Sequence, residues 1–146
     1  MNETNLKKFL EEKGIDFEII KHGSSFRADE ASRELNIVKT VLFIADKKEP
    51  LIIIVRGDKR VDQTKTAKVL GYRKLRLATA EELRNITGYE PGTLPPVAHK
   101  QNIRTVLDED VIDADYVYAG GGSLGSSLKI SPKDIARLQN ALILKI

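Results

Sequence analysis

The sequence predicts an α+β fold in which helices flank a mixed, mostly antiparallel sheet. Helix-like and strand-like segments are mixed along the 146 residues, and several neighbouring strands are joined by short, hairpin-like connections. Apolar residues make up 41% of the chain and charged residues 31%, which is typical of a folded globular protein. The length suits one hydrophobic core, so we expect residues 1–146 to form a single domain.

In the first half of the chain, apolar residues at helical or alternating spacing predict each element. A short amphipathic helix is expected over Asn5–Lys13, and a half-buried strand over Ile15–Ile19. A second helix is expected over Arg27–Asn36. Two apolar runs, Val38–Ala45 and Leu51–Val55, predict a hairpin that is buried on both faces.

In the second half, capping residues and a proline mark the helix starts. Asp62 and Thr79 are N-cap candidates, the second with Glu82 placed as in a capping box, and Pro132 suits a first helical position. These signals predict helices that begin at Asp62, Thr79 and Ser131, the first of them running to Leu70 and stopped by Gly71. The remaining apolar runs predict strands at Lys74–Leu77, Arg104–Leu107, Tyr116–Ala119 and Ala141–Ile146.

Composition excludes several kinds of site. The absence of cysteine rules out a disulfide framework, a thiol nucleophile and a cysteine-based zinc site, and two histidines cannot build a histidine-rich metal centre. No apolar run is long enough to span a bilayer, and the first residues do not resemble a signal peptide. We therefore expect a cytoplasmic protein with no metal, no cofactor, and neither a membrane nor DNA as partner. The net charge of +3 permits an RNA partner without requiring one.

The most informative segment is Thr87–Pro96, which holds two glycines and three prolines in ten residues. Proline fixes φ and removes an amide donor, whereas glycine allows conformations and close approaches that other residues do not. The combination predicts a stiff loop whose remaining amides point in set directions, which suits the binding of a small polar ligand. A rigid surface turn is the simpler interpretation of this loop taken alone.

This loop is one of five ordered motifs. Lys39-Thr40 opens an apolar strand, Val55–Asp62 precedes a helix, and Gly92–Pro96 has G-x-x-x-P spacing; Ala119–Gly122 and Ile130–Ile135 follow. In this order the motifs resemble the YbaK/prolyl-tRNA editing domain family, whose members deacylate mischarged aminoacyl-tRNA, over roughly residues 1–140. The resemblance implies a mixed, partly barrel-like sheet flanked by helices.

The resemblance implies a trans-editing hydrolase that cleaves the ester bond of mischarged aminoacyl-tRNA carrying cysteine, alanine or a similar small amino acid. Its partners would be aminoacyl-tRNA and, as a further candidate, an aminoacyl-tRNA synthetase. The alternative is a non-catalytic module that binds tRNA or a synthetase through the same cavity. Intact Lys39 and Gly92 favour the enzyme. Glycine and serine stand where the family carries a basic pair after Ala119-Gly120, and Leu128–Ile130 lacks the family aspartate; these departures favour the module and leave the amino acid open.

The same resemblance assigns roles to single residues. Lys39 is the catalytic candidate, as a fixed charge for a phosphate or an oxyanion, although a lysine at a strand end more commonly extends into solvent. Amides around Gly92 would stabilise the oxyanion of ester hydrolysis. The Gly120–Ser127 segment is either a flexible tip or a nest of amides. The expected substrate-binding residues are Thr40, Gly88, Tyr89, Gly92, Thr93, Leu94, Pro96, Gly120 and Gly121.

Basic residues offer two candidate surfaces for tRNA. Arg56, Lys59 and Arg60 flank a turn that follows the strand paired with the Lys39 strand, so they are the expected tRNA contacts. A second cluster surrounds the helix that begins at Asp62 and the exit from it. Such a cluster is ordinarily a solvated face, and it would be a tRNA footprint only if the pocket lies beside it. Its members are Lys65, Lys68, Arg73 and Lys74.

Overall fold

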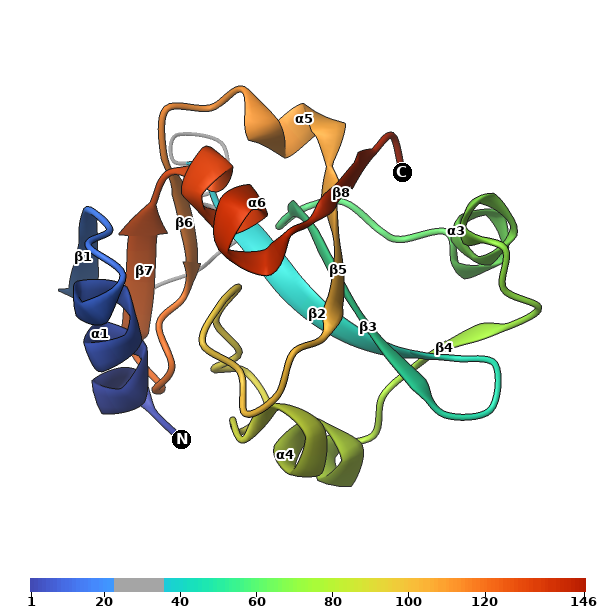
Figure 1. The fold of residues 1–146 in the computed structure, drawn as a ribbon, viewed down its shortest axis with the longest axis horizontal. Helices are drawn as coiled ribbons and strands as arrows, with labels where there is room; N and C mark the ends of the chain where they lie inside the picture. The colour runs from blue at the N-terminus through green and yellow to red at the C-terminus, as the bar shows by residue number, and fades with distance from the viewer. Residues whose placement is uncertain (23–35) are drawn as a thin grey trace.

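The computed structural model describes residues 1–22 and 36–146 (Figure 1). The helices are α1 (Glu3–Glu12), α3 (Gln63–Leu70), α4 (Ala80–Thr87), α5 (Glu109–Ile112) and α6 (Pro132–Gln139). The strands are β1 (Phe17–Lys21), β2 (Val38–Ala45), β3 (Glu49–Arg56), β4 (Leu75–Leu77), β5 (Arg104–Asp108), β6 (Val117–Gly120), β7 (Ser126–Ile130) and β8 (Leu142–Leu144).

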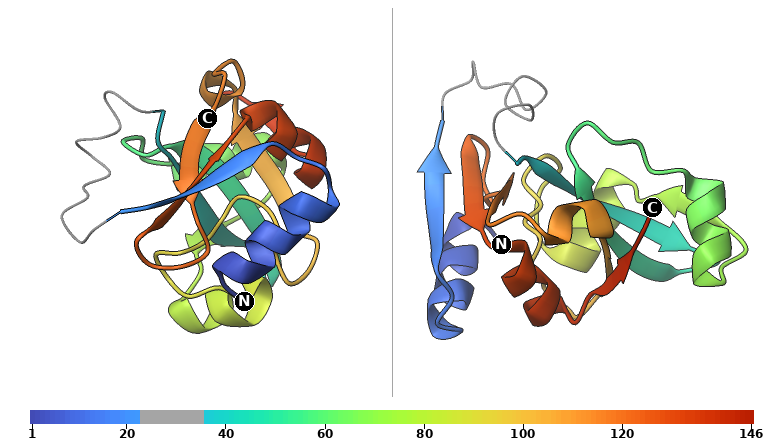
Figure 2. Two further views of the ribbon diagram at one scale, coloured as in Figure 1. Left: turned by 90° about the vertical axis from the view of Figure 1, so that its left-hand side faces the viewer. Right: turned by 90° about the horizontal axis from the view of Figure 1, so that it is seen from above.

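The described strands form two sheets. A three-stranded sheet has the order β1-β7-β6, and a five-stranded sheet has the order β4-β2-β3-β5-β8. Of the six strand pairings, four are antiparallel, while β5 runs parallel to both β3 and β8. The expected α+β class with a mixed, mostly antiparallel arrangement is therefore confirmed, with two sheets in place of a closed barrel. Figure 2 shows the smaller sheet with α1 at one end of the molecule and α3 at the other.

The central hairpin of β2 and β3 is packed on both faces, as its continuous apolar sequence predicts. Leu42 and Ile52 face a core that contains α1, α6 and the Tyr89–Ala98 loop, whereas Phe43 and Ile53 face a second core closed by α3. Because successive side chains in a strand point to opposite faces, each strand of the hairpin contributes to both cores. The two faces of β2 consequently have different neighbours, which decides the shape of the site described below.

Most helix ends follow the local sequence signals. Asp62 caps α3 by accepting from the Lys65 amide at 3.0 Å, and α4 begins with the predicted reciprocal capping box of Thr79 and Glu82. Pro132 opens α6 as expected. Helix α1 starts two residues before the predicted position, because Asn2 caps it and receives a bond from the Thr4 amide.

Several elements differ from the sequence-based expectation. Strand β7 was not predicted, since Gly120–Ser127 reads as a loop, and the short helix α5 was not predicted as an element. The predicted strand Ile15–Ile19 begins two residues later, at Phe17. The predicted helix over residues 27–36 lies, apart from Asn36, outside the described residues. No helix in the described part of the chain has the length and apolar character needed to cross a membrane.

Candidate active site

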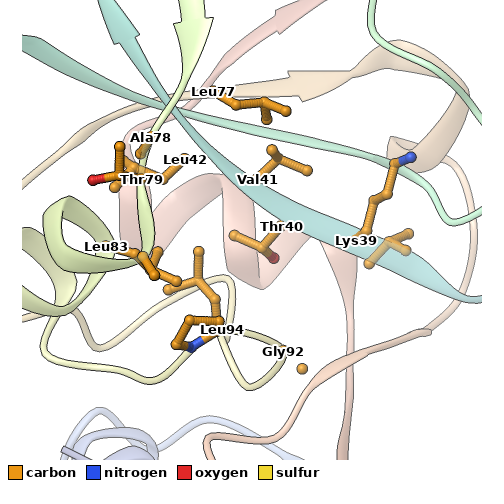
Figure 3. Close-up of a pocket in the computed structure, with 14 residues that line it drawn as sticks. Lys39, Thr40, Val41, Leu42, Leu77, Ala78, Thr79, Leu83, Gly92 and Leu94 are labelled. Atoms are coloured by element: carbon orange, nitrogen blue, oxygen red, sulfur yellow. The ribbon is translucent and has the colours of Figure 1, made fainter.

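A cavity of about 400 Å³ lies at the edge of β2, between this strand, α4 and the Gly92 loop (Figure 3). It brings together the Lys39-Thr40 pair, Gly92, Leu94 and Gly120, which the sequence places in three separate motifs. Lys39 is the one ionisable side chain among the described residues that line it. Among the described residues, the lining consists of Val38, Lys39, Thr40, Val41, Leu42, Leu77, Ala78, Thr79, Ala80, Leu83, Pro91, Gly92, Leu94 and Gly120.

The cavity exists because one edge of β2 is only partly paired. Strand β3 pairs with β2 along its whole length, whereas β4 pairs only with Phe43–Ala45. The Ala78 amide closes this edge at the Leu42 carbonyl, at 3.0 Å. Since backbone groups two residues apart in a strand point to the same edge, Thr40 presents its amide and carbonyl to the cavity.

The Thr40 side chain adds an unpaired polar group to this edge. Its Oγ1 is buried and has no hydrogen-bond partner among residues 1–22 and 36–146. Figure 3 shows the side chain on the same side of β2 as Gly92 and Leu94. A buried hydroxyl without a partner costs roughly 1–3 kcal/mol of folding free energy. Such a group is available for a hydrogen bond to a bound ligand.

Lys39 lies on the opposite face of β2 from Thr40, together with Val41. Its ammonium is directed away from Gly92 (Figure 3), and it forms no ion pair with the described residues. The pKa of Asp58 is lowered chiefly by its hydrogen bonds from Arg56, with a small electrostatic contribution from Lys39. The lysine charge therefore stands at the rim of the cavity, on the side of the Arg56–Asp58 turn.

The inner wall of the cavity is apolar. Leu42 reaches it from β2, Leu83 from α4 and Leu94 from the Gly92 loop, while Ala78 completes it from the connection between β4 and α4. Within residues 1–22 and 36–146, no carboxylate or imidazole lines the cavity to compensate a charged ligand group at this wall. Burying an unpaired charge is strongly unfavourable, so the wall suits a small uncharged group.

The Gly92 loop is held rigidly by its own backbone. The Thr93 amide and hydroxyl both donate to the Glu90 carbonyl, at 3.1 and 2.7 Å. Gly92 has φ of 84°, a left-handed conformation that side chains disfavour, and a Cβ there would meet only Leu124, at 3.9 Å. The amides of Gly92 and Leu94 make no hydrogen bond within the described chain. They remain available as donors beside the cavity.

A partly buried histidine supports this loop from behind. His99 Nε2 lies 2.7 Å from the Pro95 carbonyl oxygen, and its ring meets Tyr89 edge-on at 6.4 Å between centroids. Burial lowers the pKa of His99 to about 4, against the opposing effect of the hydrogen bond to Pro95. The ring is therefore neutral at pH 7, and its Nε2–H donates to Pro95.

The glycine-rich Gly120–Ser127 segment is packed closely against neighbouring backbone. A Cβ on Gly120 would lie 2.2 Å from the Leu94 carbonyl oxygen, and one on Gly121 would lie 2.6 Å from Ser126 backbone. The Gly121 amide donates to Ser126 and the Gly122 amide to Thr93, at 3.2 and 3.0 Å. These two amides are thus not available to a ligand, and their bonds fix the segment and the Gly92 loop in place.

Five of the expected substrate-binding residues lie outside the cavity lining. Tyr89 is 0% exposed and donates its hydroxyl to the Ala98 carbonyl at 2.9 Å, which places it in the core. Gly88 ends α4 in a left-handed conformation. Tyr89 and Gly88 therefore support the conformation of the Gly92 loop and do not line the cavity. The other three outside the lining are Thr93, Pro96 and Gly121.

Two of the three expected tRNA contacts are engaged in ion pairs. Arg56 pairs with Asp58 at 2.9 Å. Lys59 pairs at 2.6 Å with Asp108, whose side chain is 0% exposed, so this lysine neutralises a buried charge. Arg60 has no ion pair with the described residues. Releasing Lys59 to contact a phosphate would leave Asp108 buried and unpaired.

Sequence reasoning missed most of the apolar lining. Leu77, Ala78 and Leu83 could be recognised only by knowing that β4 covers part of β2 and that α4 follows it directly. The alternation of β2 was the available signal for Leu42, which shares a face with Thr40. Among the described residues, no group of three or more acidic, histidine or cysteine side chains could hold a metal ion.

Comparison with known proteins gives a consistent result. A family model described as an aminoacyl-tRNA editing domain matches residues 24–138. A proline–tRNA ligase of Aquifex aeolicus is 37% identical over 75 residues, which are 51% of this chain and 13% of the ligase. A protein of Enterococcus faecalis named as a candidate Cys-tRNA(Pro)/Cys-tRNA(Cys) deacylase, EbsC, is 26% identical over 110 residues, covering 75% of this chain and 67% of that protein.

A solved structure has the same fold over nearly the whole chain. It is described as a proposed trans-editing enzyme for prolyl-tRNA synthetase, and it superposes with a TM-score of 0.86 at 29% identity, covering 98% of this chain and 94% of its own. The resemblance found from the motifs is thereby confirmed. Since the family model spans most of the sequence, the chain belongs to the aminoacyl-tRNA editing domain family.

Proposed function

We propose that the protein hydrolyses the ester bond of mischarged aminoacyl-tRNA in trans, with the cavity at the β2 edge as its active site. The observation that carries this proposal is the meeting of four features in one cavity: the unpaired Thr40 hydroxyl, the free β2 edge, the unoccupied amides of the Gly92 loop, and Lys39. Family membership supports the same reaction.

The apolar wall supports a small, uncharged amino acid as the one that is removed. Leu42, Leu83 and Leu94 would surround an uncharged side chain such as that of alanine or cysteine. The polar edge of β2 would then meet the ester and amino groups of the substrate. The Thr40 hydroxyl would gain the hydrogen bond that it lacks in the described structure.

The hydrolysis needs a stabilised oxyanion. Water attacks the ester carbonyl carbon, negative charge develops on the carbonyl oxygen, and collapse of the intermediate expels the ribose oxygen. Amides of the Gly92 loop are suited to donate to this oxygen, because they are rigidly held and not otherwise bonded. The lining residues that the structure describes offer no carboxylate, imidazole or thiol as a general base. A hydroxyl of the substrate would therefore assist the attacking water.

Of the two roles expected for Lys39, the structure favours contact with a phosphate. Its ammonium points away from Gly92 and lies at the cavity rim, where the terminal nucleotide of the tRNA would enter. A lysine binds phosphate as a mobile point charge and needs no fixed geometry. Lys39 would thus hold the tRNA 3′ end while the loop amides act on the carbonyl.

A panel of mischarged tRNAs tests this proposal. Cysteine, alanine and serine esters of tRNA for proline, and correctly charged tRNAs as controls, would be incubated with the protein and scored for release of the amino acid. The proposal predicts release of at least one small amino acid and no effect on the correct pairs. Binding of tRNA without release of any amino acid would instead support the non-catalytic module.

A further inference from the structure

We propose that a basic surface formed by α3, β4 and the neighbouring β2–β3 turn binds the phosphate backbone of the tRNA beside its 3′ end. We call this the α3–β4 surface; it consists of Lys47, Lys48, Lys65, Lys68, Arg73 and Lys74. The inference rests on the proposed function and adds where the RNA outside the cavity is held. It moves the RNA contact away from Arg56 and Lys59, which sequence reasoning had selected.

The charge of the chain is concentrated in one segment. Gln63–Thr79 contains five basic residues and no acidic residue. The whole chain has 24 basic and 21 acidic residues, so without this segment 19 basic residues face 21 acidic ones. The net positive charge of the protein therefore comes from α3, β4 and the connection between them.

Most of these cations are free. Arg76 pairs with Glu82 at 2.8 Å and is excluded from the α3–β4 surface for this reason. Lys65, Lys68, Arg73 and Lys74 are exposed and form no ion pair with the described residues. Free, exposed cations that neutralise phosphates release the counterions condensed on the nucleic acid, whereas a paired cation must first lose its partner.

The β2–β3 turn is fixed against this segment. One carboxylate oxygen of Asp46 accepts from the amides of Arg73 and Lys74, at 2.8 and 3.1 Å, and the Asp46 amide donates to the Lys74 carbonyl at 2.8 Å. These bonds hold Lys47 and Lys48 beside the α3–β4 connection. Figure 1 shows α3, β4 and the turn at the same end of the molecule.

The α3–β4 surface leads directly into the cavity. Strand β4 ends at Leu77, which is 56% exposed and lines the cavity together with the residues that follow it. Helix α3 packs through Ala67 against the sheet face that carries Phe43. By strand alternation the same face carries Val41 and Lys39. An RNA strand that leaves the cavity past Lys39 therefore crosses Leu77 toward the free cations of α3 and β4.

The size of the cavity explains why such a surface is needed. About 400 Å³ is at the lower end of the range for small-molecule sites, so it suits a terminal aminoacyl nucleoside and not the helical stem of a tRNA. Phosphates of the adjoining nucleotides must then lie on the surface. Only eight aromatic residues occur in the chain, and the one within Gln63–Thr79, Tyr72, is half-buried and bonded to Arg104, so contact with the backbone is favoured over base stacking.

The test compares two variants with the same change in charge. The surface variant carries K65Q, K68Q, R73Q and K74Q; the control carries K7Q, K8Q, K13Q and K133Q, which replace exposed lysines on α1, at its C-cap and on α6. Binding of uncharged tRNA is measured by fluorescence anisotropy at several salt concentrations. Release of the amino acid is measured with whole aminoacyl-tRNA and with a short aminoacyl-nucleotide ester.

The surface variant should bind tRNA about tenfold or more weakly, with a salt slope smaller by about 3, since each lost phosphate contact removes about 0.7–0.9. Its activity on tRNA should fall relative to its activity on the short ester, while the control keeps both. Wild-type binding by the surface variant, or an equal loss in the control, would overturn the inference. The inference would also be overturned if anionic lipid vesicles or polyaspartate bound the wild type more tightly than tRNA does and failed to bind the surface variant.

The experiment separates this inference from the proposed function. Loss of tRNA binding in the surface variant, in a protein that hydrolyses no ester, would support the α3–β4 surface and refute the hydrolase. Hydrolysis of short esters together with unchanged tRNA binding in the surface variant would support the hydrolase and refute the α3–β4 surface.

Discussion

Replacing Thr40 by valine should make the protein more stable and less active. Valine has nearly the same shape as threonine, so the substitution removes the buried hydroxyl and leaves the packing intact. That hydroxyl has no partner in the described structure, and an unsatisfied buried hydroxyl costs roughly 1–3 kcal/mol. We expect the free energy of unfolding to rise by about 1 kcal/mol. If the hydroxyl bonds to substrate, kcat/KM should fall about two- to tenfold, the equivalent of one ordinary hydrogen bond.

Thr105→Val is the matched control. Thr105 also lies in a buried strand, but its hydroxyl donates to the Ile103 carbonyl at 3.0 Å and accepts from Gln139 at 2.9 Å. The same substitution there leaves two partners unbonded and should lower the free energy of unfolding by about 1–2 kcal/mol. Urea unfolding measures both variants, and Thr40→Ser should retain activity because it keeps the hydroxyl. A Thr40→Val protein destabilised as much as Thr105→Val would refute the reasoning, because the hydroxyl would then be bonded in the free protein.

Four further substitutions test the loop and its support. Lys39→Ala should abolish deacylation of tRNA and change the free energy of unfolding by less than about 0.5 kcal/mol; full activity with an unchanged circular dichroism spectrum would contradict this. Gly92→Ala should cost about 1 kcal/mol of stability, for its positive φ, and lower turnover by more than that loss explains, as steady-state kinetics would show. Gly120→Ala should destabilise by several kcal/mol in urea, because its Cβ would meet the Leu94 carbonyl at 2.2 Å, and a mild loss would mean that the backbone yields easily. His99 has a folded pKa of about 4, below its unfolded value, so the unfolded chain takes up protons first and stability falls as pH drops from about 6.5 to about 4. The loss at pH 5 should be at most about 2 kcal/mol, and His99→Gln should remove it from urea curves at pH 7.5 and 5.

Local signals were sufficient for most of the fold. Capping residues at Asp62 and Thr79 located two helix starts, and the apolar runs located the central hairpin. Strand β7 was not predicted, because Ser126 and Ser127 follow five residues rich in glycine and serine, and such a sequence is typical of a loop. Its pairing with both β1 and β6 is a long-range property that no local pattern reveals.

The motifs indicated a candidate site, and the structure shows where its residues lie. The motifs located Lys39, Thr40 and Gly92 at one cavity, although they are separated by about 50 residues. What they could not give was the face on which each side chain lies, since that depends on the register between β2 and its neighbours. Register turns Lys39 away from Gly92, and it buries Lys59 against Asp108.

The basic surface illustrates the same limit. The cluster of Lys65, Lys68, Arg73 and Lys74 is visible in the sequence, but a solvated face is the ordinary interpretation of such charges. Only the pairing of β4 with β2 brings this cluster beside the cavity. Its functional interpretation therefore requires the structure.

The most direct test of the central claim is to measure whether the protein hydrolyses mischarged tRNA and whether filling the cavity stops this reaction. Alanine and cysteine esters of tRNA for proline would be mixed with the wild type and with Leu83→Trp, which fills the apolar wall from α4. We predict release of a small amino acid by the wild type, and loss of this activity in Leu83→Trp with little change in tRNA binding. Hydrolysis that survives the filled cavity would place the reaction elsewhere. No release of any small amino acid by the wild type would contradict the account.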